Sequence, residues 1–188
     1  MVGIHIFENN GCSDRIRITV RDKYGRIKSD HYLNERWYQI VQRRLHLKHF
    51  SMTNVGFADV AGLVENLGGP PAYFTVIGIG TGTQAAAATD TKLAMADGAA
   101  VKLKTATTMT RVLGNVADDT NEWIATFNNA TDGITGTKLI TEVGIFNGVV
   151  NGTSDMLLHQ VYTPSDSVNF DQGDSITVTV TMLNKQGT

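Results

Sequence analysis

The chain has 188 residues, of which 41% are hydrophobic, and its formal net charge at neutral pH is −2. A chain of this length can bury roughly 70% of its unfolded surface, so one domain can fold without disulfides or metal ions. No apolar run approaches the ~20 residues of a membrane-spanning helix, the N-terminus has no signal-peptide pattern, and the single Cys12 excludes an internal disulfide and fits a reducing cytoplasm.

The charges are unevenly distributed along the chain. Residues 1–50 contain ten Lys or Arg and five Asp or Glu, whereas the remaining residues contain six and thirteen, so the two parts carry +5 and −7. A basic leading segment followed by an acidic remainder indicates that residues 1–50 meet a negatively charged partner. Nucleic acid and the acidic face of a neighbouring copy both fit this charge, but no nucleic-acid-binding motif accompanies it.

The first predicted element is a β-hairpin over residues 15–33, RIRITVRDKYGRIKSDHYL. Apolar residues alternate with polar ones through Ile16, Ile18 and Val20, and a glycine-containing turn follows at residues 22–25. The outward positions of the first strand would give the hairpin a cationic face. They are Arg15, Arg17 and Arg21.

Two helices are predicted next. In residues 34–50, Asn34 can cap a helix whose apolar residues follow helical spacing. Residues 54–67 carry one apolar stripe, and the Gly-Gly-Pro-Pro sequence behind it ends the helix. We expect residues 1–50 to form a basic hairpin-plus-helix docking extension and residues 51–188 to form the body, with the helix 54–67 leading it.

The body has the pattern of a mainly β protein. Its predicted strands are residues 73–79, 101–112, 121–127, 138–146, 156–162 and 175–183. The last of them, SITVTVTML, alternates apolar residues with Ser and Thr as a half-buried strand does. Short strands separated by polar turns predict a β-sandwich or jelly-roll-like body with one or two helices and an N-terminal β-hairpin extension.

Alternating glycines at Gly78, Gly80 and Gly82 follow an apolar run, as at the start of a nucleotide-binding loop. A dinucleotide-binding loop would need a glycine where Thr83 stands, and a P-loop would need a lysine after Gly82. We therefore interpret the glycines as architecture, with Gly80 and Gly82 allowing a turn or tight bend as the strand leaves the sheet.

Other polar groups also fall short of a reaction centre. His46 and His49 supply two ligands where a zinc site needs three or four, and no G-x-S-x-G nucleophile motif is present. Asp118 and Asp119, followed by Trp123, are predicted to form a solvated turn, with a cation- or sugar-binding loop as the alternative. The sequence thus predicts no catalytic residue, no cofactor and no metal site.

Residues 53–183 resemble a group of small structural proteins of tailed bacteriophages, labelled tail-fibre or virion proteins. The matching pieces occur in order: TNVGFADVAGLV, YFTVIGIGTGTQAAAATDTKL, ATF, LITEVGIFN, MLLHQVYTP and GDSITVTVTM. The resemblance implies a non-enzymatic component of the virion that assembles in the host cytoplasm, without membrane contact.

The role that we expect is a capsid decoration (cement) subunit or a small tail or collar adaptor, because fibres that reach for receptors usually need a longer chain. Its partners would be the major capsid or tail and collar proteins and further copies of itself, since homo-oligomers are common. The alternative is a receptor-binding tail-fibre or tail-tip module that recognises a glycan through Asp118, Asp119 and Trp123. The residues predicted to lie at interfaces are Arg15, Arg17, Arg21, Trp37, Tyr38, Arg43 and Arg44.

Overall fold

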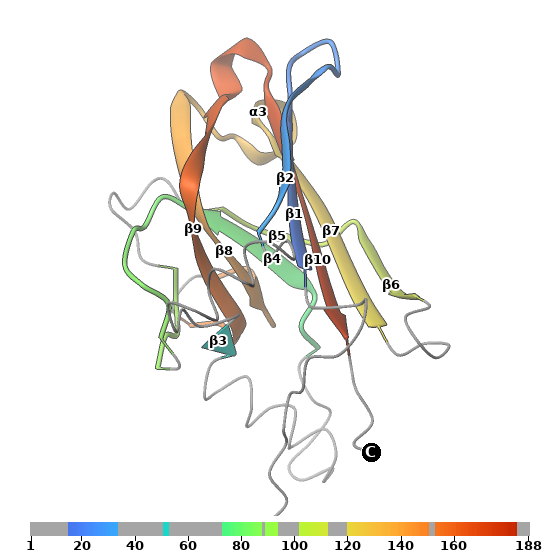
Figure 1. The fold of residues 1–188 in the computed structure, drawn as a ribbon, viewed down its shortest axis with the longest axis vertical. Coiled ribbons are helices and arrows are strands. Elements are labelled where there is room, and N and C mark those ends of the chain that lie inside the picture. Colours follow the sequence, from blue (N-terminus) through green and yellow to red (C-terminus); the bar gives the residue numbers. More distant parts are fainter. Residues whose placement is uncertain are drawn as a thin grey trace, which may run out of the picture.

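The computed structural model describes residues 15–33, 51–52, 73–87, 89–93, 102–112, 120–150 and 153–183. These residues form two five-stranded antiparallel sheets that pack face to face, so the predicted mainly β sandwich is confirmed (Figure 1). Sheet A has the order β2 (Ile27–Tyr32), β1 (Arg15–Arg21), β10 (Ser175–Leu183), β7 (Thr120–Asn128), β6 (Thr108–Val112). Sheet B has the order β3 (Ser51–Met52), β9 (Met156–Asn169), β8 (Thr137–Phe146), β4 (Val76–Gly80), β5 (Lys102–Thr105).

The main core lies between the two sheets and consists of the inward residues of each strand. In β10 these are Ile176, Val178 and Val180, each fully buried, while the Ser and Thr residues between them are half-buried on the outer face. Sheet B contributes residues such as Val143 and Ile145 from the other side. The period of two in the sequence therefore decides which face of each strand enters the core.

The β1–β2 hairpin is part of this core. β1 pairs with β10 along its whole length, from Arg15↔Thr181 to Arg21↔Ser175, and its inward residues Ile16, Ile18 and Val20 are at most 1% exposed. The predicted division between a docking extension and a body beginning at residue 51 is therefore wrong for residues 15–33. An alternating strand must bury its apolar face, and sheet A is where this one does so.

Two other strand predictions need correction. The predicted strand 101–112 is two strands in different sheets, β5 and β6, and the chain turns between them where Ala106 N donates to Thr75 O at 2.8 Å. β9 continues seven residues beyond the predicted end at residue 162, and its pairing with β8 resumes after a bulge that shifts the register between Glu142↔Val161 and Ile140↔Asp166. The predicted helices 34–50 and 54–67 lie outside the described residues.

Short helical turns close one end of the sandwich. α3 (Asn129–Asp132) follows β7 and the 3-10 helix η1 (Phe170–Gln172) precedes β10. Asn128 and Asn169 cap these turns with their side chains, and each ends at a glycine in the left-handed conformation. The turn of the β1–β2 hairpin lies at the same end of the molecule (Figure 1).

Candidate functional site

The chain that leaves β4 crosses the outer face of sheet B, on the side away from sheet A (Figure 1). We refer to residues 81–93 as the covering segment. Its last residue, Leu93, is fully buried in a second, smaller core. The other members of that core are Val76, Leu103, Phe146 and Met156. Sheet B is therefore buried on both faces at this point, since its inner face lies in the main core.

The glycines of β4 and β8 make room for this cover. A Cβ atom on Gly78 would lie 2.9 Å from Phe146 Cε2 and 3.0 Å from Leu93 Cδ1, and one on its neighbour Gly144 would lie 2.8 Å from Phe146 Cε2. A Cβ atom on Gly80 would overlap the carboxylate of Glu142. The glycines are thus architectural, but Gly78 and Gly80 lie within β4 and admit packed side chains rather than a bend.

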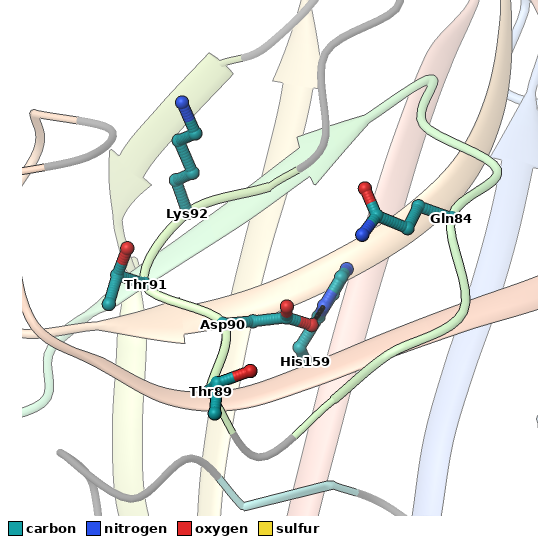
Figure 2. A pocket seen from close by; sticks show the side chains of 6 residues that line it. All are labelled: Gln84, Thr89, Asp90, Thr91, Lys92 and His159. Carbon is teal, nitrogen blue, oxygen red and sulfur yellow. Dashed lines mark hydrogen bonds and ion pairs between the residues drawn. The ribbon is translucent and has the colours of Figure 1, made fainter.

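A buried histidine joins the covering segment to the sheet. His159 of β9 is 1% exposed, and its Nδ1 atom lies 2.6 Å from Asp90 Oδ2 in the covering segment. Its Nε2 atom lies 3.0 Å from Oε2 of the fully buried Glu142 of β8. Figure 2 shows the Asp90 and His159 side chains pointing toward one another. We call Asp90, Glu142 and His159 the carboxylate–histidine clamp.

The clamp is an ion-paired arrangement. Burial on its own would lower the pKa of His159, but hydrogen bonds and charge attraction from Glu142 and Asp90 outweigh burial and raise that pKa above its ordinary value of 6.5. A carboxylate at each ring nitrogen favours an imidazolium that donates both N–H groups. A ring in this state has no lone pair to accept a proton from a substrate, so the clamp is suited to holding two elements together.

Both carboxylates of the clamp also bind backbone groups of the covering segment. Glu142 Oε1 accepts from Gly82 N at 2.9 Å, and Asp90 Oδ2 accepts from Ala87 N at 2.7 Å. The neighbouring Thr141 hydroxyl donates to Gly82 O at 2.6 Å. The buried Glu142 therefore fixes the start of the segment, and the partly buried Asp90 fixes its end through His159 while also binding Ala87 N within the segment.

A small pocket of about 190 Å³ lies beside the clamp. In Figure 2 the Lys92 side chain extends away from His159, and the two threonines flank Asp90 along the chain. The pocket is lined by Gln84, Thr89, Asp90, Thr91, Lys92 and His159. The lining is thus entirely polar or charged, and the pocket lies where the clamp meets the protein surface.

Buried carboxylates elsewhere also join separate parts of the chain. Asp166 of β9 accepts from Ser29 Oγ of β2 at 2.7 Å and from the Tyr162 hydroxyl at 3.3 Å. Burial, followed by the charge of Asp166, raises the pKa of Tyr162 above its ordinary value.

Two lysines form ion pairs of the same kind. Lys104 Nζ of β5 lies 3.0 Å from Asp132 Oδ1 of α3, and Lys28 of β2 pairs with Asp174. Four acidic side chains after residue 50 are thus buried and form contacts within the fold, which the charge count could not reveal. They are Asp132, Glu142, Asp166 and Asp174.

Three of the five predicted interface arginines lie on the hairpin. Arg17 and Arg21 are exposed on the outer face of β1, as their alternation predicts. Arg17 forms two hydrogen bonds to Asp30, at 2.6 and 2.8 Å, and Arg21 donates to Gly25 O at 2.8 Å. Their role at an interface stays a prediction. Arg15 lies at the start of β1, whereas Trp37, Tyr38, Arg43 and Arg44 lie outside the described residues.

Trp123 does not occupy the exposed loop that the glycan-binding alternative requires. It lies in β7, is 7% exposed, and its Nε1 atom donates to Phe74 O at 2.8 Å. The segment alternates inward Trp123, Ala125 and Phe127, which is the period-two pattern of a core strand. Asp118 and Asp119 lie outside the described residues.

The clamp itself was not predicted, although the sequence carried part of its signal. Glu142 and His159 each stand in an otherwise apolar strand run, TEVGIF and MLLHQV. Because charged side chains are rarely buried without a partner, two such residues in buried strands indicate a pair. The contribution of Asp90 could not be found this way, since it lies 69 positions from His159 in an irregular segment.

Comparisons with protein-family models, with curated proteins and with solved structures find no match to this chain. In the part of the chain that the structure describes, no helix is long and apolar enough to cross a bilayer. Among the same residues, no group of three or more His, Cys, Asp or Glu side chains is placed to hold a metal ion.

Proposed function

We propose that the protein is a structural component of a bacteriophage virion that acts by non-covalent assembly and catalyses no reaction. The role that fits its size is a capsid decoration (cement) subunit or a small tail or collar adaptor. It would assemble in the host cytoplasm, as a homo-oligomer, onto the major capsid or tail and collar proteins. The resemblance of the ordered sequence pieces to small phage virion proteins supports this proposal, together with the β-sandwich fold.

The observation that carries the proposal is that the buried charged side chains connect separate elements of the fold. Glu142 and His159 hold the covering segment on sheet B through Gly82 and Asp90, Asp166 joins β9 to β2, and Asp132 joins α3 to β5. Catalytic sites instead present a free titratable group to the substrate, whereas His159, although it borders the pocket, is 1% exposed and has a carboxylate at each ring nitrogen. Charges that cross-link the fold suit a protein that must stay rigid under load within a particle.

The glycan-binding alternative loses its main support in this structure. The predicted glycan loop uses Trp123 as an accessible ring, whereas the Trp123 ring is packed in the main core and its N–H group donates to Phe74 O.

The test is the composition of purified particles of the phage that encodes the chain. We expect quantitative mass spectrometry to find the protein in a fixed ratio to the major capsid protein after density-gradient purification. Electron microscopy of particles that carry an antibody label would then place it on the head, for a decoration subunit, or at the tail or collar, for an adaptor. Absence from washed particles, or turnover of an envelope polysaccharide by the pure protein, would contradict the proposal.

A further inference from the structure

The turn of the β1–β2 hairpin combines positive charge with an exposed aromatic ring. We call residues 21–28 the hairpin tip. It contains four cationic residues and one acidic residue, Asp22. Tyr24 at its centre is 72% exposed, and Ile27 beside it is 53% exposed. The four cationic residues are Arg21, Lys23, Arg26 and Lys28.

The hairpin tip is held in one conformation although it is exposed. Asp22 Oδ1 accepts from Tyr24 N at 2.9 Å and from Arg26 N at 3.0 Å, and Asp22 N donates to Arg26 O at 2.9 Å. Gly25 N donates to Asp22 O at 2.9 Å with a φ of 78°, a conformation that glycine adopts without strain. A turn that is already ordered loses little conformational entropy when it binds a partner.

Two cations also lie over the exposed ring. Lys23 Nζ is 5.1 Å and Arg26 Cζ is 5.3 Å from the centroid of the Tyr24 ring, within the range of cation–π attraction. The ring and the two charges therefore lie together at the end of the sandwich. Tyrosine and arginine are the residue types that contribute most to binding energy at protein interfaces.

We propose that the hairpin tip docks on an acidic surface of a neighbouring virion protein, with Tyr24 as its central anchor and Lys23 and Arg26 as its charged rim. This inference rests on the proposed function and names the surface through which the protein would join the particle. Lys28 pairs with Asp174 and Arg26 with Asp22, and the tip still keeps a net positive charge that complements a partner surface of negative potential.

Two observations favour a different acidic protein as the partner. Of the acidic residues that the structure describes after residue 50, four are buried and engaged in internal contacts, so a second copy presents less negative surface than its sequence suggests. The cations of the tip surround a single ring within one turn, whereas binding to a nucleic-acid backbone uses cations spread along the strand.

The hairpin tip differs from the interface predicted from charge alone. Arg17 is held by Asp30 and its guanidinium lies over Tyr32, 5.5 Å from the ring centroid, so its contacts are within the hairpin. Lys23 and Tyr24 were not among the predicted interface residues, because nothing in the sequence pattern distinguishes them from an ordinary solvated turn.

The experiment measures binding of the purified full chain to phage particles assembled without it, by co-sedimentation. The variants are Lys23→Glu and Tyr24→Ala. Their matched controls are Lys102→Glu, at a half-buried lysine of β5, and Tyr73→Ala, at a tyrosine that is 70% exposed next to β4. We expect each tip variant to bind about tenfold more weakly, a typical loss for one anchor residue, and each control to bind as the wild type does. Arg26 is left unchanged because its guanidinium also holds Asp22 at 2.7 Å.

A photo-reactive phenylalanine derivative at position 24 identifies the partner. We expect it to cross-link to one virion protein, within a peptide rich in Asp and Glu, and the same group at position 73 to give no such product. Wild-type affinity for both tip variants would overturn the docking site and leave the proposed function standing. A cross-link to nucleic acid or to a second copy would overturn the partner, and failure of the wild type to join particles would overturn both proposals.

Discussion

The two antiparallel sheets differ in their outer faces: that of sheet A is polar, whereas that of sheet B is largely apolar and carries a buried charge. The outer face of sheet A carries threonines, among them Thr126 and Thr177, whose hydroxyl oxygens lie 2.8 Å apart across β7 and β10. The outer face of sheet B carries glycines, Phe146 and a buried Glu142, and the covering segment lies over it. A polar face can remain against water, whereas an apolar or charged one must be covered and its charges paired.

This contrast explains why the two sheets differ in their sequence patterns. β10 alternates strictly, because one of its faces is buried and the other is wet. β4 reads VIGIG and is buried at all five positions, because both of its faces are covered. The glycines that resembled a phosphate-binding loop are a consequence of double burial, where one strand face packs directly against the side chains of the cover.

The largest predicted effect comes from removing the centre of the clamp. His159→Ala leaves Glu142 and Asp90 without their shared cation in a buried site, which we expect to destabilise the fold by about 3–5 kcal/mol. The measurement is the free energy of unfolding in urea. His31→Ala is the matched control, because His31 also faces a carboxylate, at 3.4 Å from Asp166, but its side chain is 32% exposed. A loss equal to that of the control would contradict the importance assigned to the clamp.

A smaller loss of stability is expected when a methyl group is added to a glycine beneath the covering segment. In Gly144→Ala the added methyl group would lie 2.8 Å from Phe146 Cε2, 3.0 Å from Leu93 Cδ2 and 3.2 Å from Leu158 O, a backbone atom that cannot rotate away. Overpacking of this kind costs about 1–3 kcal/mol. Thermal unfolding of Gly148→Ala provides the comparison, since its methyl group would meet mainly the Ser154 hydroxyl, which can rotate. If both variants melt together, the cover does not pack as closely as the structure shows.

The charge of the clamp can be removed without mutation, by raising the pH. The pKa of His159 is raised in the folded state, so its protonation stabilises the fold fully below about 6.5, the value in the unfolded chain, and this contribution disappears as the pH rises through the folded value. The charged groups facing or flanking the ring are Asp90, Glu142 and Lys92.

Unfolding free energies of the wild type and of His159→Ala, taken from about pH 6 to about pH 9, test this sign. The difference between the two proteins isolates the histidine from the other titrating groups. We expect that difference to shrink with rising pH. A difference that grows would mean that the ring is neutral in the folded protein at low pH.

Sequence patterns predicted the fold well wherever a strand had one wet face. The hairpin and β10 follow from alternation, and the end of β8 at Phe146 was predicted to the residue. The assignment of the hairpin to the core was missed because alternation predicts a buried face without saying what buries it. The division of residues 101–112 between two sheets was missed for a related reason, since Ala106 and Thr107 carry no Gly or Pro signal for the corner.

The candidate site was harder to predict because its parts are joined only by the fold. Glu142 and His159 lie on adjacent strands and could have been paired from their isolated positions in apolar runs. Asp90 reaches them from a segment without regular structure, through a contact that no local spacing encodes. Net charge was a misleading guide to the surface for the same reason, since it counts buried, paired side chains such as Asp132 and Asp174 together with surface charges.

The smallest effect should come from the outer face of sheet A. Thr126→Val and Thr177→Val each remove one hydroxyl of a pair that water can also hydrate, so each should change the free energy of unfolding by about 0.5–1 kcal/mol or less. A double-mutant cycle measures the pair itself, and we expect a coupling of about 0.5 kcal/mol. A coupling as large as the loss in His159→Ala would mean that these hydroxyls are shielded from water in the isolated chain. The outer face of sheet A would then be as well shielded from water as that of sheet B, and the contrast between the two faces would not hold.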